Sequence, residues 1–235
     1  MPDPPRITVV VPIHDEADYL PGALAALLDE LAAVDADATV VLAENGSTDG
    51  TAELADQLAA EHPSVIARHR DVADYGAAMR DGFMSASGDW VVNFDIDYFS
   101  GDFLAQTLAL EPRPDIVLAS KRVEGADDRR NPMRRTATWG FNLTLRVLFG
   151  SAVSDTHGMK AVRIEVVEAI APSVVATQDL FDTELVIRAE RAGYRIVELA
   201  ASVEELRATG IGLLKRVPRT LVGLLHLRWR LWRGR

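Results

Sequence analysis

The amino-acid sequence predicts an α/β fold in which a mainly parallel sheet carries helices on both faces. Short apolar, β-branched runs alternate along the chain with longer segments whose apolar residues recur at helical spacing. The apolar runs are nearly continuous rather than alternating, which is typical of strands covered on both sides. Of the 235 residues, 48% are hydrophobic and 26% are charged, the composition of an ordered domain.

The amino-terminal half contains predicted strands and helices in alternation. The strands are expected at residues 7–13, 39–43, 65–68 and 90–94. The helices between them are expected at residues 17–34, 48–62 and 77–86. Leu20, Leu24 and Leu27 show the helical periodicity of the first helix. This order predicts parallel pairing, so the carboxyl ends of the strands should share one edge, where ligands collect in such sheets.

The carboxyl-terminal half is less regular. Residues 121–135 are an expected polar loop rich in arginine. Further strands are expected at residues 116–119 and 195–199, and further helices at residues 136–149 and 181–192. We expect one domain over residues 1–209 and a helical tail over residues 210–235, broken at Pro218.

Charge is unevenly distributed along the chain. The 25 basic and 35 acidic residues give a formal net charge of −10, which argues against a general nucleic-acid partner. Residues 215–235, by contrast, contain seven basic residues and no acidic one.

The absence of cysteine excludes disulfides, thiolate metal sites and a cysteine nucleophile. Neither a signal peptide nor about 18 consecutive apolar residues occurs, so we expect a cytoplasmic chain without a spanning helix.

Two carboxylates, Asp95 and Asp97, follow the predicted strand at residues 90–94. In a strand that continued, side chains two positions apart would point the same way. Neighbouring carboxylates repel each other, and a hard divalent cation with its phosphate ligands relieves that repulsion. This pair is therefore a candidate metal site, and the alternative is a polar strand end without a ligand.

Polar segments also follow the first two strands, at residues 12–16 and 44–51. Gly46 permits a positive φ, and Ser47 or Thr48 is expected to cap the second helix. The segment after the first strand is expected to cap the first helix. The acids and amides of both segments are also suitable hydrogen-bond partners for a base or a ribose.

Taken in order, these segments resemble the family 2 glycosyltransferases, which have the GT-A fold. The motifs of that family are P-x-x-N-E, D-D-G-S-T-D-G-T, G-x-A-x-x-x-G, G-D and D-x-D. Their counterparts in this chain are residues 12–16, 44–51, 76–82, 88–89 and 95–97. Order and spacing agree over about the first hundred residues.

The chain departs from these motifs at four positions. Asp15 stands in place of Asn, Glu44 and Asn45 in place of two aspartates, and Phe99 in place of a Gln that often helps to hold the metal. No G-x-G-x-x-G follows the first strand and no Walker lysine is found, which excludes dinucleotide oxidoreductases and P-loop enzymes.

The second half resembles the polyprenyl-phosphate branch of this family, which includes dolichyl-phosphate mannose synthases and glucosyltransferases. Residues 119–121 stand where that branch has G-S-R, and residues 155–160 resemble its D-x-x-x-G-F-K segment, one residue shorter. Its spaced R, S and N correspond to Arg134, Thr138 and Asn142. Its F-x-x-E-L and G-Y-R-I-x-E segments correspond to residues 181–185 and 193–198.

The resemblance implies an inverting transfer of a sugar from a nucleotide-diphospho-sugar to a polyprenyl phosphate. Asp95 and Asp97 would hold Mg²⁺ or Mn²⁺ against the diphosphate, and Lys121 and Arg134 would position the acceptor phosphate. The implied donor-binding residues are Pro12, His14, Glu16, Glu44, Asn45 and Asp95. GDP-mannose and UDP-glucose both remain open as donors. A different acceptor, or a non-catalytic nucleotide-sugar binder, is the alternative.

Trp229 and Trp232 lie among basic residues in the tail, beside an apolar stripe. This pattern favours a helix at the surface of a membrane, with the enzyme peripheral on its inner face. The alternative is a helix packed on the domain or on a partner subunit. Deletion of residues 221–235 is expected to lower binding to anionic vesicles.

Four other positions have simpler expectations. Trp139 and Met159 are expected in the core, and His157 is expected to be structural. Glu184 is equally compatible with a helix surface and with the site.

Overall fold

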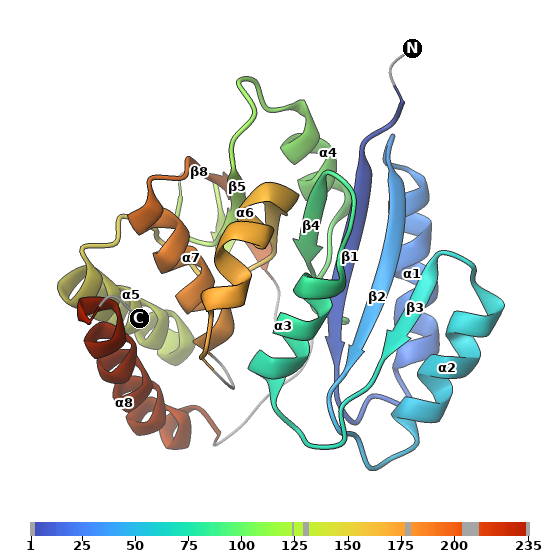
Figure 1. The fold of residues 1–235 in the computed structure, drawn as a ribbon, viewed down its shortest axis with the longest axis horizontal. Coiled ribbons are helices and arrows are strands. Elements are labelled where there is room, and N and C mark those ends of the chain that lie inside the picture. Colours follow the sequence, from blue (N-terminus) through green and yellow to red (C-terminus); the bar gives the residue numbers. More distant parts are fainter. Residues whose placement is uncertain (1–2, 124, 129–131, 177–179, 204–211, 234–235) are drawn as a thin grey trace.

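The structure is a computed structural model that describes residues 3–123, 125–128, 132–176, 180–203 and 212–233. A seven-stranded sheet forms its centre with helices on both faces, and helices α5 and α8 lie together at the end far from β3 (Figure 1). The predicted α/β class is confirmed. The predicted boundary between residues 209 and 210 falls outside the described residues. Within the ranges given, no helix combines the length and the apolar character needed to cross a membrane.

The central sheet has the strand order β3-β2-β1-β4-β7-β5-β8. The strands are β1 Arg6–Ile13, β2 Asp37–Glu44, β3 Val65–Arg68, β4 Trp90–Asn93, β5 Ile116–Ser120, β7 Lys160–Arg163 and β8 Ile196–Ala200. β7 runs antiparallel to β4 and β5, and the other pairs are parallel. Two short strands, β6 Asp127–Asp128 and β9 Ser202–Val203, form a separate parallel pair. The sequence pattern does not predict β7, because two of its four residues, Lys160 and Arg163, are charged and interrupt the apolar pattern of a buried strand.

The helices cover both faces of the sheet, as predicted. They are α1 Leu20–Ala32, α2 Thr51–Glu61, α3 Tyr75–Ser85, α4 Gly101–Ala109, α5 Pro132–Phe149, α6 Ile164–Ile170, α7 Phe181–Ala192 and α8 Gly212–Trp232, with a 3-10 helix at Ala171–Ser173. Alternate residues of β1 show the arrangement. Val9 and Val11 pack with α1, α2 and α4, whereas Val10 packs with α3, α6 and α7. The continuous apolar run of β1 is explained by this double burial.

Two helices, α4 and α6, are absent from the sequence prediction. α4 starts directly after the acidic turn, where the hydroxyl of Ser100 caps it by accepting a hydrogen bond from the N–H of Phe103 at 3.1 Å. α6 is short and follows β7 without a loop, so its apolar residues cannot be separated from those of the strand by periodicity alone. α5 begins at Pro132, before the predicted residue 136.

α8 is continuous through Pro218, where the sequence predicts a break. A proline inside a helix removes a backbone hydrogen bond and costs about 3 kcal/mol. Packing in the later turns offsets this cost, because Leu224 and Leu227 are buried against Leu145 of α5 and Ile187 of α7. α8 therefore packs on the rest of the domain along one face.

The expectation for Trp139 is wrong, whereas Met159 is buried as expected. Trp139 is 54% exposed, because α5 packs with its opposite face, through Leu145, into the cluster shared with α7 and α8. Leu143 and Val147 share the outer face with Trp139 at helical spacing and are also exposed. α5 thus carries an apolar stripe on its outer surface.

Candidate active site

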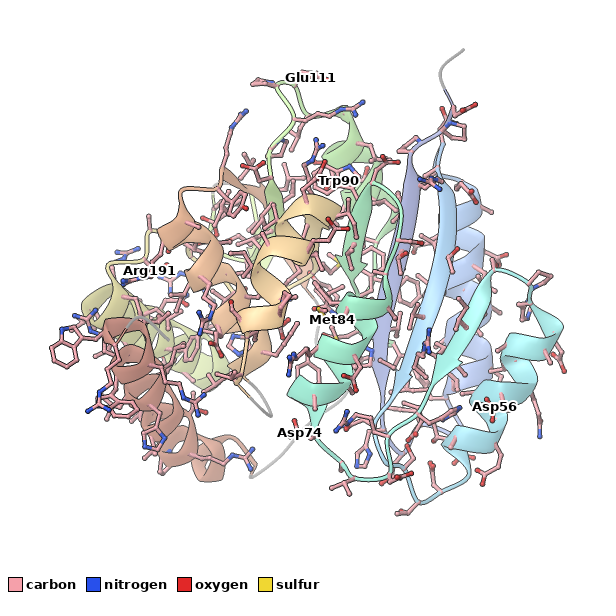
Figure 2. The ribbon with its side chains drawn as sticks, viewed as in Figure 1. Asp56, Asp74, Met84, Trp90, Glu111 and Arg191 are labelled. Atoms are coloured by element: carbon pink, nitrogen blue, oxygen red, sulfur yellow. The ribbon has the colours of Figure 1, made fainter. Side chains whose placement is uncertain are left out.

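The carboxyl ends of β1, β2 and β4 lie at one edge of the sheet, because these neighbouring strands run parallel. In Figure 2, Asp74 at the start of α3 lies at this edge, and Trp90 and Glu111 lie at the opposite one. The polar segments that the sequence singles out all follow these three strands. The topology therefore brings them together, as predicted.

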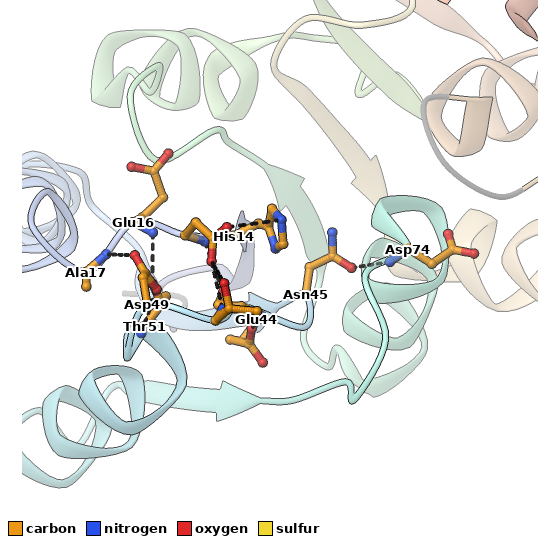
Figure 3. A network of polar contacts seen from close by, with 11 residues as sticks. His14, Glu16, Ala17, Glu44, Asn45, Asp49, Thr51 and Asp74 are labelled. Carbon is orange, nitrogen blue, oxygen red and sulfur yellow. Dashed lines mark hydrogen bonds and ion pairs between the residues drawn. The ribbon is translucent and has the colours of Figure 1, made fainter.

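The loops after β1 and β2 are locked together by hydrogen bonds (Figure 3). Asp15 accepts a hydrogen bond from the N–H of Thr48 at 2.8 Å, and its own N–H donates to the hydroxyl of Ser47 at 3.0 Å. Asp15 has a φ of 53°, a conformation that Asp and Asn adopt more readily than other non-glycine residues. The replacement of the family's Asn by Asp15 is therefore compatible with this loop.

Asp49 adds a second link between the two loops. Its carboxylate accepts hydrogen bonds from the hydroxyl of Thr51 at 2.5 Å, from the N–H of Thr51 at 3.0 Å and from the N–H of Ala17 at 3.1 Å. The hydroxyl of Thr51 first, and then the N–H of Ala17, lower the pKa of Asp49 below its ordinary value. Asp49 is thus held as a carboxylate within the loop.

The predicted capping residues do not cap their helices. α2 begins after Gly50, which has a φ of 92°, while Ser47 and Thr48 contact the loop after β1. α1 begins after Tyr19, which makes no capping hydrogen bond with its side chain. The two loops are fixed by contacts with each other, which gives the edge of the sheet a preformed polar rim.

Glu44, at the end of β2, is buried and bonded within the protein. Its Oε1 accepts a hydrogen bond from the N–H of Ser47 at 2.6 Å, and its Oε2 lies 3.4 Å from Nδ1 of His69. Nε2 of the same ring lies 2.9 Å from Asp56. Burial lowers the pKa of His69, but hydrogen bonds and charge from Asp56 and Glu44 outweigh that effect and raise it overall. Glu44 therefore shapes the loop and leaves little of its carboxylate for a ligand.

Asn45 offers a donor at the same edge. Its Oδ1 accepts a hydrogen bond from the N–H of Asp74 at 2.6 Å. In Figure 3 its amide nitrogen points away from Asp74. The fixed oxygen orients the amide, so that its N–H groups are directed away from Asp74.

The other predicted donor-binding residues lie on or after β1. Pro12 is half-buried within the strand, and the side chain of His14 is 44% exposed, 3.6 Å from Asp15. The N–H of Glu16 donates to the hydroxyl of Thr51 at 2.8 Å, and its carboxylate points away from that contact (Figure 3). These positions are compatible with donor binding but are not tested by the structure.

Asp95 and Asp97 lie in a tight turn and not in a continuing strand, because β4 ends at Asn93. The turn is closed by two backbone hydrogen bonds between Asp95 and Tyr98, of 3.1 and 3.0 Å. The predicted same-side arrangement of a strand therefore does not apply. The turn instead presents both carboxylates at the strand end, directly before α4.

Burial raises the pKa of Asp95 to about 6. The nearby charge of Lys160 opposes this rise, and the charges of Asp182 and Asp97 reinforce it. Asp95 is therefore a carboxylate with too little positive charge around it. A cation bound at the turn would supply that charge.

The donor set fits Mg²⁺ or Mn²⁺. Both cations bind carboxylate oxygens and usually take one or two carboxylates together with phosphate oxygens and water. Among the described residues, no three His, Asp or Glu side chains converge to hold a metal by themselves. Asp95 and Asp97 would therefore share the ion with a diphosphate, and Phe99 contributes no ligand atom in place of the family's Gln.

Of the predicted acceptor residues, Lys121 lies beside the acidic turn. Its Nζ is 5.6 Å from the centre of the Tyr98 ring and 3.8 Å from Oδ2 of Asp155. Arg134 is in the first turns of α5, and its side chain is outside the described part of the structure. The structure thus places Lys121 at the site and leaves Arg134 untested.

A buried polar network under the acidic turn was not predicted. Lys160 is fully buried, and its Nζ donates to Oδ1 of Asn93 at 2.7 Å and to Oδ1 of Asp182 at 2.9 Å. The hydroxyl of Tyr75 donates to Oδ2 of Asp182 at 2.8 Å. The network joins β4, β7, α7 and α3 below Asp95. Lys160 stands among the apolar residues Met159, Ala161 and Val162, and a lone lysine in such surroundings is the sequence signal that could have revealed the network.

Of the two alternatives for Glu184, the helix surface is wrong. Glu184 is fully buried and accepts hydrogen bonds from the N–H groups of Val175 and Ala176 and from Arg188. It holds the loop before α7. His157 packs edge-on against the ring of Phe141, which agrees with a structural role.

Comparisons with known proteins agree with this geometry. The family described as Glycosyl transferase family 2 matches residues 8–171. Undecaprenyl-phosphate mannosyltransferase of Micrococcus luteus is 30% identical over 208 residues, 85% of this chain and 84% of that protein. Polyprenol monophosphomannose synthase of Mycolicibacterium smegmatis is 30% identical over 215 residues, 85% of this chain and 78% of that protein. Glycosyltransferase AglD of Haloferax volcanii is 29% identical over 96% of this chain, which spans 37% of AglD.

Solved structures share the fold. Glucosyl-3-phosphoglycerate synthase from Mycobacterium tuberculosis, in complex with Mn²⁺, uridine diphosphate and glucosyl-3-phosphoglycerate, has a TM-score of 0.68 at 20% identity, over 95% of this chain and 80% of that one. Mannosyltransferase PcManGT from Pyrobaculum calidifontis, in complex with GDP-Man and Mn²⁺, has a TM-score of 0.61 at 22% identity, over 97% of this chain and 65% of that one. Both support the GT-A arrangement of strands and helices.

Proposed function

Because this chain belongs to family 2 of the glycosyltransferases, we propose that it transfers a hexose from a nucleotide-diphospho-sugar to the phosphate of a polyprenyl lipid, with inversion at the anomeric carbon. The observation that carries the proposal is the acidic turn of Asp95 and Asp97 with Lys121 beside it, at the carboxyl edge of the sheet. Two relatives that align with 85% of this chain are named for transfer of mannose to a lipid phosphate, which makes GDP-mannose the first donor to assay.

The chain's own residues would divide the work as follows. Asn45, Glu16 and the loop held by Glu44 would face the nucleoside, and Asp95 and Asp97 would bind Mg²⁺ or Mn²⁺. The bound cation would stabilise the negative charge that develops on the departing nucleoside diphosphate.

The acceptor needs positioning more than deprotonation. A phosphate monoester has a second pKa of about 6, so it is largely dianionic at neutral pH and is a competent nucleophile without a protein base. Lys121 and Arg134 would hold it by charge-assisted hydrogen bonds facing the anomeric carbon. His157 would take no part, in keeping with its contact with Phe141.

The test of the donor site is a thermal-shift series with GDP and UDP, each with and without Mn²⁺. A ligand at a hundred times its dissociation constant stabilises a protein by about 2.7 kcal/mol. In a domain of this size, one such ligand should raise the melting temperature by roughly 5–11 °C. We expect that rise for one nucleoside diphosphate and only with the metal. NAD is the control, and the absence of any shift in folded protein would contradict the proposal.

The surface formed by α5 and α8 would bring the site to the membrane. Its exposed apolar residues are Trp139, Leu143 and Val147 on α5 and Leu221, Val222, Leu225, Trp229 and Trp232 on α8. Arg219 and Arg228 are exposed on α8, and Arg233 is exposed directly after it, with its guanidinium 3.9 Å from the centre of the Trp229 ring. Aromatic and basic side chains on one helix favour an anionic lipid surface, and we propose the cytoplasmic face of the membrane as the place of action.

Replacement of Leu225, Trp229 and Trp232 by serine is expected to weaken binding to vesicles that contain phosphatidylglycerol by roughly tenfold or more, because full burial of one large apolar side chain contributes about 1.5–3 kcal/mol. Co-sedimentation measures the effect. Substitution is a better test than deletion of residues 221–235, which would also remove the buried Leu224 and Leu227. Ile66→Ser, at an exposed residue of β3 far from this surface, is the matched control. Equal binding by both variants would contradict the membrane contact.

A soluble phosphorylated acceptor is the second candidate, because glucosyl-3-phosphoglycerate synthase shares the fold. It would use the same donor site. The two are separated by assaying donor turnover with polyprenyl phosphate and with phosphoglyceric acid. Turnover with phosphoglyceric acid alone, unaffected by the serine substitutions in α8, would favour the soluble acceptor.

A further inference from the structure

His69, in the loop between β3 and α3, has a carboxylate on each side of its ring. Its Nδ1 lies 3.4 Å from Oε2 of Glu44, at the end of β2, and its Nε2 lies 2.9 Å from Oδ1 of Asp56 on α2. The side chain of Glu44 is 2% exposed, whereas those of His69 and Asp56 are 34% and 68% exposed. The ring therefore bridges a buried carboxylate and a carboxylate at the surface.

Only the charged form of the ring satisfies both contacts. A neutral imidazole has one N–H donor and one nitrogen that accepts, whereas a carboxylate only accepts. The imidazolium has an N–H on each nitrogen and can donate to Glu44 and Asp56 together. Burial lowers the pKa of His69, but hydrogen bonds and charge from these two acids outweigh burial and raise it. The neighbouring Arg70 is paired with Asp81 of α3.

The loop after β2 depends on the carboxylate that His69 contacts. Oε1 of Glu44 accepts a hydrogen bond from the N–H of Ser47 at 2.6 Å, while Oε2 faces His69. The hydroxyl of Ser47 accepts a hydrogen bond from the N–H of Asp15 at 3.0 Å, which joins this loop to the loop after β1. His69 therefore supports the residue on which the preformed polar rim is built.

The loop that contains His69 also holds Asn45. Oδ1 of Asn45 accepts a hydrogen bond from the N–H of Asp74, which stands directly before α3, at 2.6 Å. A Cβ at residue 46 would lie 2.6 Å from the backbone nitrogen of Ala73, so the loops after β2 and β3 pack directly against each other. The contact of Glu44 with His69 and that of Asn45 with Asp74 thus fix the same two loops together.

Starting from the proposed function, we propose that charged His69 is a positioning residue for the nucleoside part of the donor. It acts through Glu44, which fixes the loop that contains Asn45, and does not contact the donor itself. Loss of the proton from His69 leaves one of its two carboxylates without a donor and loosens the link between β2, β3 and α2. The affinity for the donor therefore falls as the pH rises.

The direction of this pH effect follows from the raised pKa of His69. The contribution of the charged ring is complete below the ordinary histidine pKa of about 6.5 and is lost as the pH rises through the higher value of the folded chain. A phosphate group also loses a proton in this range, with a second pKa of about 6. That ionisation is common to all variants of the chain, so the ratio of two affinities at one pH isolates His69.

The first test is isothermal titration calorimetry with GDP and with UDP, in the presence of Mn²⁺, at about pH 6 and about pH 8.5. The variant is His69→Gln, which does not titrate. At the lower pH, we expect it to bind the nucleoside diphosphate about fivefold more weakly than the wild-type chain, the low end for coupled sites, because the ring is partly exposed. At the higher pH the two affinities should agree. His226→Gln, at an exposed residue of α8, is the matched control.

A constant ratio at both pH values would show that His69 is only structural, and equal affinities at the lower pH would show that it has no role in binding. Either result would overturn the proposal while leaving the proposed function intact. If the wild-type chain binds neither GDP nor UDP at any pH, the proposed function itself fails, and the role of His69 fails with it.

Asp56→Asn provides a second variant at an exposed position of α2. It removes one of the two negative charges beside the ring, so the pKa of His69 should fall. The loss of donor affinity should then occur at a lower pH than in the wild-type chain. A loss of affinity at the same pH in both proteins would contradict the bridge.

A further measurement needs neither a ligand nor a variant. NMR signals of the His69 ring, followed through a pH titration of the wild-type chain, should give a pKa above the ordinary value of 6.5. A pKa at or below that value would show that the ring is neutral near pH 7, and the charged bridge would be refuted.

Discussion

Asp97→Asn is expected to reduce sugar transfer by at least about a hundredfold while the domain remains folded, because loss of one charged ligand weakens both binding of the metal and stabilisation of the leaving group. The turn that carries Asp97 is closed by backbone hydrogen bonds between Asp95 and Tyr98, so the amide should be accommodated without rearrangement. Turnover of nucleotide-sugar with polyprenyl phosphate and Mn²⁺ is the measurement. The metal-dependent thermal shift with a nucleoside diphosphate should disappear in parallel.

The control for this prediction is Asp29→Asn, which removes an exposed carboxylate from α1 and changes the net charge by the same amount. It should leave turnover and the thermal shift unaltered. If Asp97→Asn retained most of its turnover, the acidic turn would not hold the metal, and the chemistry would have to be assigned to other residues.

Lys160→Met is expected to cause the largest loss of stability among single substitutions in the site. Lys160 is fully buried, and its ammonium group is paired with Asp182 at 2.9 Å. Removal of one partner of a buried ion pair leaves the other charge without compensation and costs about 3–5 kcal/mol. In a chain of this size that corresponds to a fall in melting temperature of roughly 6–20 °C. Differential scanning calorimetry measures it.

The double variant Lys160→Met with Asp182→Asn tests the cause. An amide at residue 182 keeps an acceptor for the hydroxyl of Tyr75 and removes the unpaired charge. Its melting temperature should lie well above that of Lys160→Met alone, as in a double-mutant cycle with strong coupling. A double variant no more stable than the single one would show that the loss comes from the cavity around residue 160 and not from the charge.

The sequence predicts the strands and the polar segments at the carboxyl edge of the sheet well, because their order follows from local patterns. Continuous apolar runs such as that of β1 identify strands that are buried on both faces, and parallel strands must end at a common edge. The acidic pair after β4 could therefore be placed at that edge from the sequence. The conformation of the pair could not be predicted, because three residues are too few for a sequence pattern to distinguish a tight turn from a continuing strand.

The remaining features depend on contacts between distant segments. The sequence predicts Glu44 as a donor-binding acid. In the structure its carboxylate accepts a hydrogen bond from the N–H of Ser47 and lies beside the ring of His69, which follows β3. Lys160 reads as a surface residue and is buried because β7 inserts between β4 and β5. The orientation of Trp139 follows from which face of α5 meets α8. No local pattern encodes these choices, because each depends on which partner the fold brings alongside.

The antiparallel insertion of β7 also bears on the order in which the chain folds. Strands β1 to β4 pair among themselves within the first hundred residues, whereas β7, at Lys160–Arg163, joins β4 on the side away from β1. Because β7 is synthesised after all four of these strands, its pairing with β4 comes last during synthesis. During synthesis, β4 would therefore present an open edge until β7 emerges from the ribosome. An exposed strand edge of this kind invites pairing with other chains. The acidic turn at the end of β4 would acquire its anchor only at that late step.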